Sequence, residues 1–362
     1  MTQTTSNSIV KTRYWHRLDD GRLQCDLCPR HCHLREGQRG LCYVRQRLDD
    51  EVKLVTYGRS SGFCIDPIEK KPLNHFFPGS AVLSFGTAGC NLACKFCQNW
   101  DMSKSREMDT LADSASPRQL ALTASAHDCL SVAFTYNDPV IFHEYAIDVA
   151  AACREQGINT VAVTAGYIDP EPRVEFFAAM DAANVDLKAF TERFYRKICG
   201  SQLGPVLETL QYIHHETDCW LEITTLLIPG ENDSDSEIDE LSHWVADNLG
   251  VDVPLHFSAF HPDWKMRDTE STPPATLTRA REIALGNDLR YVYTGNVHDR
   301  NGSSTWCHAC GELLIERDWY VLGHWGLDQD GHCANCGASL PGHFAPQPGN
   351  FGAQRIPISI NR

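Results

Sequence analysis

The 362-residue chain lacks several features that would place it in other classes of protein. No stretch approaches the roughly 18 apolar residues of a membrane span, and the first residues contain no apolar segment typical of a secretion signal. Positive charge is scarce: 32 Lys and Arg stand against 47 Asp and Glu, and the net charge of −15 argues against binding nucleic acid over the whole surface. These absences predict a cytoplasmic chain without a membrane partner. The hydrophobic content of 42% is sufficient for a large core, which excludes extensive disorder.

Cysteine, in contrast, is abundant, with 16 residues. Most of them form three groups along the sequence: Cys25, Cys28, Cys32 and Cys42; Cys90, Cys94 and Cys97; and Cys307, Cys310, Cys333 and Cys336. In a chain without an export signal, clustered cysteines indicate metal binding or redox chemistry rather than disulfide bonds. The remaining five are expected to be packed free thiols: Cys64, Cys129, Cys153, Cys199 and Cys219.

Between the outer cysteine groups, short apolar segments alternate with helical patterns. We expect strands at 81–86, 131–136, 159–166, 184–190, 220–230, 254–260 and 289–296. After the second strand they recur every ~25–35 residues, which is typical of βα units with parallel strands. The pattern predicts an α/β fold with a complete or partial (β/α) barrel. An open doubly wound sheet is the alternative.

The composition predicts four regions along the chain. Residues 1–64 are a cysteine-rich N-terminal segment, 65–297 the barrel, 298–342 a zinc-ribbon or rubredoxin-like module, and 343–362 an irregular tail rich in Pro, Gly and Asn. In barrels of parallel strands the chemistry sits at the carboxyl ends of the strands. Polar residues follow the predicted strands at those ends: Asn137, Asp138, Thr164, Asp186, Lys188, Glu231, Asp233, His261 and Asn296.

The central cysteine group directly follows the first of these predicted strands, in the sequence GCNLACKFCQNW with the spacing C-x3-C-x2-C. Structural zinc sites and ordinary electron-transfer clusters use four ligands, whereas a 4Fe–4S cluster held by three thiolates leaves one iron open. An open iron can bind the amino and carboxylate groups of S-adenosylmethionine (SAM). One electron from the reduced cluster then cleaves SAM to a 5′-deoxyadenosyl radical, which abstracts hydrogen from a substrate. The alternative is a structural site completed by a distant fourth ligand.

These residues resemble the radical SAM superfamily, especially the branch that contains pyruvate formate-lyase activating enzyme. The segments that carry the resemblance occur in order along most of the chain: KKPLNHFFPGS, CNLACKFCQNW, FTYNDPVIFHEY, VDLKAF, LLIPGEND, FHPDWKM and YVYTGN. The ordered set looks most like the radical enzymes of AmmeMemoRadiSam gene systems. The resemblance implies a partial (β/α)6 TIM-like barrel, with a 4Fe–4S cluster on Cys90, Cys94 and Cys97 and with SAM as the second cofactor.

The resemblance also implies contacts to SAM at the second barrel strand. Family members commonly read TYNEP there, and a carboxylate or amide binds the amino group of SAM. This chain has Asn137, Asp138 and Pro139, so a shorter Asp replaces the usual Glu.

Further contacts are implied at later strands. Asp186 and Lys188 should face the ribose and carboxylate of SAM, and His261 should approach the nucleoside. Taken alone, Lys188 also fits a salt bridge and His261 an ordinary loop histidine. Gly89 and Gly166 suit close approach of the backbone to a cluster or cofactor, or plain turns.

The two flanking cysteine groups predict further metal sites. Cys307, Cys310, Cys333 and Cys336 form two C-x2-C knuckles ~22 residues apart, close to the spacing of zinc ribbons. Four thiolates suit zinc or a single iron, and zinc is favoured as a structural staple for a small module. Cys25, Cys28, Cys32 and Cys42 have the spacing C-x2-C-x3-C-x9-C, which fits no zinc class well. Structural zinc and an auxiliary Fe–S cluster both remain open there, with zinc slightly favoured because no redox partner is visible.

The sequence therefore predicts an enzyme that generates a deoxyadenosyl radical. Its expected partners are an electron donor such as flavodoxin or ferredoxin and proteins of the same gene system. The substrate is a protein glycine, as in glycyl-radical activation, or a small molecule or modification site on a partner protein. A non-catalytic, cysteine-rich metal-binding adaptor is the alternative, and the intact central cysteine group argues against it.

Overall fold

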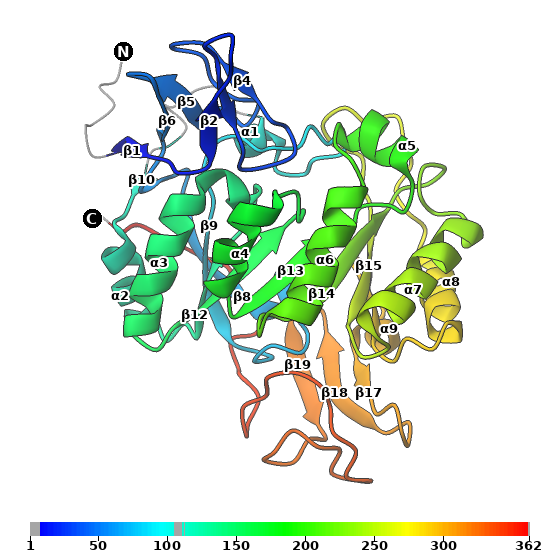
Figure 1. The fold of residues 1–362 in the computed structure, drawn as a ribbon. Coiled ribbons are helices and arrows are strands. Elements are labelled where there is room, and N and C mark those ends of the chain that lie inside the picture. Colours follow the sequence, from blue (N-terminus) through cyan, green and yellow to red (C-terminus); the bar gives the residue numbers. More distant parts are fainter. Residues whose placement is uncertain (1–7, 105–110, 112, 361–362) are drawn as a thin grey trace.

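The centre of the molecule is one curved sheet of nine strands (Figure 1). The computed structural model describes residues 8–104, 111 and 113–360. In spatial order the strands are β16 (Val292–Gly295), β15 (Leu255–Ala259), β14 (Trp220–Leu227), β13 (Ala182–Asp186), β12 (Asn159–Thr164), β11 (Ser131–Phe134), β9 (Ala81–Phe85), β8 (Phe63–Pro67) and β20 (Ile356–Ile358). Those from β16 to β9 run parallel, and β8 and β20 are antiparallel additions at one edge. Within the described residues no pairing joins β16 to β20, so the barrel is partial.

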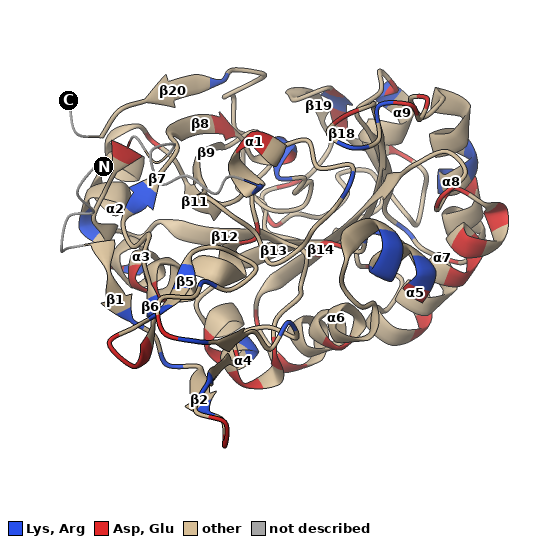
Figure 2. Ribbon diagram, turned by 90° about the horizontal axis from the view of Figure 1, so that it is seen from above, with Lys and Arg blue, Asp and Glu red and all other residues tan. Residues whose placement is uncertain are grey.

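Helices connect the parallel strands and lie along the convex side of the sheet, as the view from above shows (Figure 2). They are α2 (Pro117–Ala126), α3 (His143–Glu155), α4 (Pro170–Ala178), α6 (Gly204–Glu216), α7 (Asp235–Leu249) and α8 (Pro274–Gly286). Short segments join them: η2 (Ile68–Lys70), α1 (Trp100–Ser103), η4 (Pro139–Phe142), α5 (Glu192–Phe194) and the π-helical η5 (Tyr195–Cys199). Side-chain caps begin two of the longer helices, α2 and α7, since Ser116 accepts from the backbone N–H of Gln119 and Ser234 from that of Glu237. The alternation of strands and helices expected from the sequence is confirmed.

The N-terminal segment forms two small sheets above the carboxyl ends of the barrel strands (Figure 1). One contains β1 (Val10–Lys11), β6 (Glu51–Leu54) and β5 (Arg45–Leu48), and the other β2 (Trp15–Arg17), β3 (Leu23–Cys25) and β4 (His33–Leu34). A separate pair follows, β7 (Arg59–Ser60) with β10 (Asp113–Ser114).

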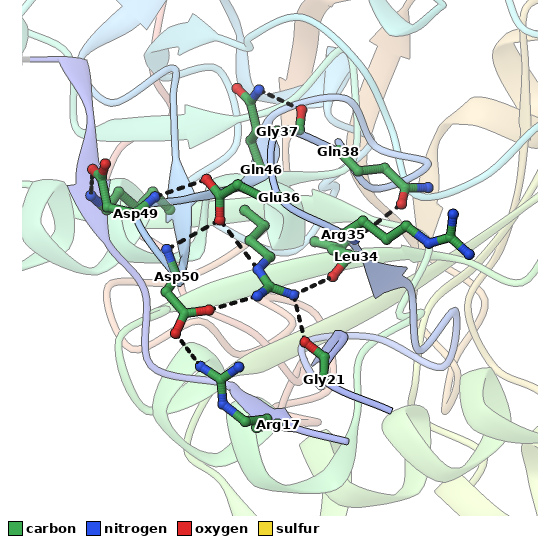
Figure 3. Close-up of polar contacts among 12 residues, drawn as sticks. Arg17, Gly21, Leu34, Arg35, Glu36, Gly37, Gln38, Gln46, Asp49 and Asp50 are labelled. Atoms are coloured by element: carbon green, nitrogen blue, oxygen red, sulfur yellow. Dashed lines mark hydrogen bonds and ion pairs between the residues drawn. The ribbon is translucent and has the colours of Figure 1, made fainter. Parts of the chain in front are cut away.

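Polar contacts join the loops of this segment (Figure 3). The guanidinium of Arg47 donates to the carbonyl oxygens of Gly21 at 2.8 Å and Leu34 at 3.1 Å and pairs with Asp50 at 2.6 Å. Glu36 accepts from the backbone N–H groups of Asp49 and Asp50. The segment is thus held by its own side chains.

A third sheet lies at the opposite end of the barrel (Figure 1). After α9 (Arg300–Ser303) it contains β17 (Thr305–Trp306), β18 (Leu313–Asp318) and β19 (Val321–Trp325), all antiparallel. Buried Arg317 donates to the carbonyl oxygen of Asn74 at 2.7 Å, which ties this module to the segment before β9. His75 continues the connection, with Nε2 at 2.6 Å from the hydroxyl of Tyr293 and Nδ1 at 2.7 Å from the carbonyl oxygen of Pro341.

The tail after residue 342 contains one strand in addition to its irregular part. Ile356–Ile358 form β20, which pairs with Phe63–Ile65 of β8. Without it, β8 would be the outer strand of the sheet, with unpaired backbone N–H and C=O groups. The tail therefore completes the sheet edge.

Candidate active site

A cavity of about 550 Å³ lies at the carboxyl ends of the parallel strands. It is lined by the three central cysteines and by many of the polar residues predicted at the strand ends: Cys90, Cys94, Cys97, Asn137, Asp138, Thr164, Asp186, Lys188 and Asn296. Other residues that no sequence pattern indicated line it as well, among them Lys70, Lys71, Tyr136, Tyr320 and Arg355. The predicted residues that line the cavity are up to about 200 positions apart in the sequence. They lie together because the carboxyl ends of parallel strands meet at one end of the barrel.

The loop of the cysteine triplet is held from two sides. Asn137 accepts from the backbone N–H of Thr87 at 3.1 Å and donates to the carbonyl oxygen of Gly89 at 2.8 Å. On the other side, the N–H of Ala93 bonds the carbonyl oxygen of Cys199 at 2.8 Å. Asn137 therefore positions the loop, and its amide keeps one hydrogen and one acceptor position beyond these two bonds.

Cys94 is the triplet cysteine whose environment favours the thiolate. Its pKa is lowered, because the thiol of Cys199 donates a hydrogen bond to it and the ammonium groups of Lys188 and Lys104 lie nearby. Burial raises the pKa of Cys90 to about 12. Cys199 was expected to be an ordinary packed thiol, and nothing in its sequence neighbourhood indicated this contact.

Asp138 is buried and already has three hydrogen-bond donors. Its Oδ1 accepts from the N–H of Val140 at 3.0 Å and from the hydroxyl of Thr164 at 3.1 Å, and Oδ2 accepts from the N–H of Ala165 at 3.0 Å. Burial raises the pKa of this carboxyl group, and the hydrogen bonds oppose that shift. Since each oxygen can accept two hydrogen bonds, one acceptor position remains on Oδ2.

Asp186 and Lys188 form an ion pair at the cavity wall, with 2.9 Å between Nζ and Oδ2. Burial alone would lower the pKa of Lys188, but the carboxylate of Asp186 and the sulfur of Cys94 raise it well above its usual value. The lysine therefore stays charged. Both the salt-bridge role and the cavity-facing position expected from the sequence are present in one side chain.

A second cluster of charged residues lies at the cavity wall near β8. Asp66 is fully buried and binds Lys70 and Lys71, each at 2.9 Å, and it accepts from the hydroxyl of Tyr136 at 2.8 Å. Burial lowers the pKa of Lys71 to about 8, and Asp66 limits that shift. The KKPLNHFFPGS segment carried the resemblance stated above, but no pattern within it assigned these lysines to the cavity.

Two residues expected at the cofactor do not line the cavity. His261 is exposed, and it is not among the lining residues. The loop after β15 instead turns toward the triplet, where Trp264 stacks on Trp100 with ring centroids 4.9 Å apart. Gly166 is not among the residues that line the cavity. Its φ is +64°, and a Cβ at this position would contact the side chain of Val185.

The flanking cysteine groups differ in geometry. The sulfurs of Cys307, Cys310, Cys333 and Cys336 all lie within 4.8 Å of one another, an arrangement able to hold one metal ion. Cys25, Cys28, Cys32 and Cys42 line a separate, smaller cavity, together with Asn91 of the triplet loop.

Comparison with known proteins places this geometry in a family. Residues 85–242 match the Radical SAM superfamily. An uncharacterized protein of Methanocaldococcus jannaschii is 38% identical over 328 residues, covering 90% of this chain and 97% of that protein. The chain belongs to the radical SAM superfamily.

Activating enzymes are among the radical SAM relatives. Pyruvate formate-lyase 1-activating enzyme of Escherichia coli K12 is 22% identical over 225 residues, covering 57% of this chain and 89% of that enzyme. Among solved structures, a domain of pyruvate formate-lyase-activating enzyme from Bacteroides vulgatus has 19% identity and a TM-score of 0.41, covering 46% of this chain and 99% of that one. A radical SAM methyltransferase from Sphaerobacter thermophilus has 14% identity and a TM-score of 0.49, covering 84% and 81%. Family membership makes this chain an enzyme of radical SAM type.

None of the helices in the described part of this radical SAM chain combines the length and apolarity that a membrane span requires.

Proposed function

We propose that Cys90, Cys94 and Cys97 hold a 4Fe–4S cluster and that the adjoining cavity binds SAM and a substrate. The observation that carries the proposal is the convergence of these three thiols with the polar strand ends on one cavity. Three cysteines leave one iron of such a cluster without a protein ligand. The cavity volume of about 550 Å³ lies in the range of small-molecule sites, ~300–1,000 Å³. In addition, the buried hydroxyl of Thr224 in the cavity wall has no hydrogen-bond partner among the described residues.

The protein groups have distinct roles in this proposal. When bound, the reduced cluster supplies the electron that cleaves SAM to a 5′-deoxyadenosyl radical, which takes hydrogen from the substrate. The remaining acceptor position on Asp138 Oδ2 binds the amino group of SAM. The ammonium of Lys188 binds the SAM carboxylate, and Asp186 faces the ribose. Thr224 donates its hydroxyl hydrogen to an oxygen or nitrogen of the bound molecule.

Anaerobic reconstitution with iron and sulfide tests this proposal. Reduced by dithionite, or by flavodoxin or ferredoxin as the proposed physiological donor, the wild-type chain should convert SAM to 5′-deoxyadenosine. Cys94→Ala should abolish this reaction because one iron ligand is lost. Cys153→Ala is the matched control, since this thiol is also buried but lies on α3, away from the cavity. Equal cleavage by both variants would refute the ligand assignment.

A second candidate concerns the substrate. The activating-enzyme relatives favour a glycine of a partner protein as the source of the hydrogen atom. Transfer of deuterium from a glycine-labelled candidate protein into 5′-deoxyadenosine would support this substrate class. Transfer from a labelled small molecule, with none from the protein, would exclude it.

A further inference from the structure

The N-terminal cysteines converge on a cavity of their own. Cys25, Cys28, Cys32 and Cys42 all line it, and three of the four are buried, with Cys32 partly exposed. The remaining lining residues include two apolar side chains, Leu27 and Ile141. Four cysteines that line one cavity have the chemistry of a metal centre, because thiolates are soft ligands for zinc and iron.

The spacing of these thiols distinguishes them from the C-terminal site. There, the sulfur of Cys307 lies 3.6 Å from that of Cys336, and the sulfur of Cys310 lies 3.7 Å from that of Cys333. A tetrahedral zinc ion with Zn–S bonds of ~2.3 Å places its sulfurs about 3.8 Å apart, so the C-terminal set has the size of a single ion.

The N-terminal thiols are arranged differently. Among the described residues, which include all of 25–42, these four cysteines do not form a group able to hold a single metal ion as the C-terminal four do. Cys90, Cys94 and Cys97 do not form such a group either. A centre with several irons bridged by sulfide requires wider spacing of its thiolates than one ion does.

Backbone hydrogen bonds position the loops that carry these thiols. The N–H of Cys25 bonds the carbonyl oxygen of Cys32 at 3.0 Å, and the N–H of His31 bonds that of Cys28 at 3.1 Å. The N–H of Gly40 bonds the carbonyl oxygen of Arg45 at 2.8 Å, which closes the loop that carries Cys42. The guanidinium of Arg47 also joins neighbouring loops of this segment, because it donates to the carbonyl oxygens of both Gly21 and Leu34. The four thiols are therefore preorganised at these positions.

Positive charge lies beside the cavity. Arg30 and Arg45 both line it. The charge of Arg45 is balanced by Glu144, whereas Nη2 of Arg30 is buried and has no hydrogen-bond partner among the described residues. A cluster with four thiolate ligands is anionic, and a buried anion needs cationic or hydrogen-bonding neighbours.

The cavity shares a wall with the triplet loop. Asn91, next to Cys90 in sequence, lines the N-terminal cavity, and its carbonyl oxygen accepts from Nε of Arg30 at 2.7 Å. From the other direction, the backbone of Cys42 contacts Gly89.

We propose that Cys25, Cys28, Cys32 and Cys42 ligate a second iron–sulfur cluster, located next to the loop of the cysteine triplet. The sequence slightly favoured zinc at this position, and the arrangement of the four thiols reverses that preference. This site does not depend on the SAM chemistry proposed for the triplet.

The experiment uses full-length chains that were reconstituted anaerobically with iron and sulfide. In Cys90→Ala/Cys94→Ala/Cys97→Ala, which leaves the N-terminal segment intact, iron and acid-labile sulfide should remain in a ratio of about 1:1, as in Cys-ligated clusters. Adding Cys25→Ser and Cys28→Ser to this variant should remove both. Adding Cys333→Ser instead is the matched control, and it should leave sulfide unchanged.

Two results would overturn the inference. One is a triple-alanine variant without acid-labile sulfide, with its circular dichroism unchanged. The other is a zinc equivalent in this variant that Cys25→Ser and Cys28→Ser remove. A failure of the proposed function would give a different result. Wild type and the triple-alanine variant would then contain equal amounts of iron and sulfide, and neither would cleave SAM.

Discussion

The carbonyl oxygen of Cys42 lies directly against the Cα atom of Gly89, so a Cβ added to this glycine would overlap that oxygen. Cys42 belongs to the N-terminal cysteine group, and Gly89 immediately precedes the first cysteine of the triplet. The two cysteine groups thus meet backbone to backbone. The φ of Gly89 is +85°, a conformation that side-chain-bearing residues rarely adopt.

Gly89→Ala should therefore displace the triplet loop. Gly157→Ala is the matched control, since Gly157 has a φ of +68° but no atom within 4 Å of its Cβ position. The unfolding free energy of the control should fall by only about 1–2 kcal/mol, which is the cost of placing a residue with a Cβ in a left-handed backbone conformation. Gly89→Ala should lose more stability than this and most of its SAM cleavage. Denaturant unfolding and 5′-deoxyadenosine formation measure the two effects, and equal behaviour of the variants would contradict the contact.

Asp138 should be important for stability as well as for SAM binding. Asp138→Ala leaves the N–H groups of Val140 and Ala165 without acceptors, and each unsatisfied buried group costs about 1–3 kcal/mol. Asp138→Asn keeps the shape and removes the charge, so SAM affinity should fall roughly tenfold to a hundredfold.

The comparison variant for Asp138 is Thr164→Val. It removes one of the three donors to this carboxylate and keeps the acceptor position on Oδ2. Isothermal titration of SAM should find its affinity within a few-fold of wild type. If Asp138→Asn binds SAM as wild type does, this carboxylate does not hold the amino group.

The C-terminal cysteine site should contain one metal ion, and zinc is the expected metal. Cys333→Ser should remove it and make residues 298–342 sensitive to protease, since four close thiols at the site are the main feature that joins both knuckles. SAM cleavage driven by dithionite should survive at least in part, because the cysteine triplet and the polar strand ends belong to the barrel and this module contributes Tyr320 to the cavity wall. Elemental analysis that finds one iron and no zinc at these thiols would contradict the structural role.

His75 should make stability depend on pH. Burial lowers its pKa from 6.5 to about 4, with Glu222 opposing the shift and Arg317 and His256 adding to it. Because the unfolded chain binds this proton first, stability is complete above pH 6.5 and is lost as the pH falls toward 4. Between pH 7.5 and 5.5 the loss from this group should be roughly 1–2 kcal/mol.

The test compares wild type with His75→Gln, which has no titrating group and can still donate to Pro341 and accept from Tyr293. Urea unfolding at the two pH values should show a smaller decrease for the variant. Identical decreases would show that His75 does not titrate in this range.

Much of the barrel was predictable because short segments of the sequence are sufficient to indicate its strands. The segments 81–86, 131–136 and 159–166 are short apolar runs between turn residues, and they form β9, β11 and β12 with nearly the expected bounds. The triplet was predictable because three cysteines within eight residues, directly after a buried strand, are typical of very few kinds of site.

Other features depend on contacts between distant residues. Nothing local in Ile356–Ile358 indicates a strand, because its partner β8 is nearly the whole chain away. The contact of Cys199 with Cys94 depends on how η5 packs against the triplet loop. His261 follows a correctly predicted strand, but the position of a residue in the sequence does not determine where its side chain points after the strand ends. The side chain of His261 is exposed to solvent.

The pairing of β20 with β8 also has a consequence for synthesis on the ribosome. β8 leaves the exit tunnel long before its partner, which follows it by about 290 residues together with Arg355 of the cavity wall. Until β20 has been made, the edge of β8 has unpaired backbone groups and the cavity lacks part of its wall. The nascent chain must therefore keep this edge from pairing with other strands until β20 emerges.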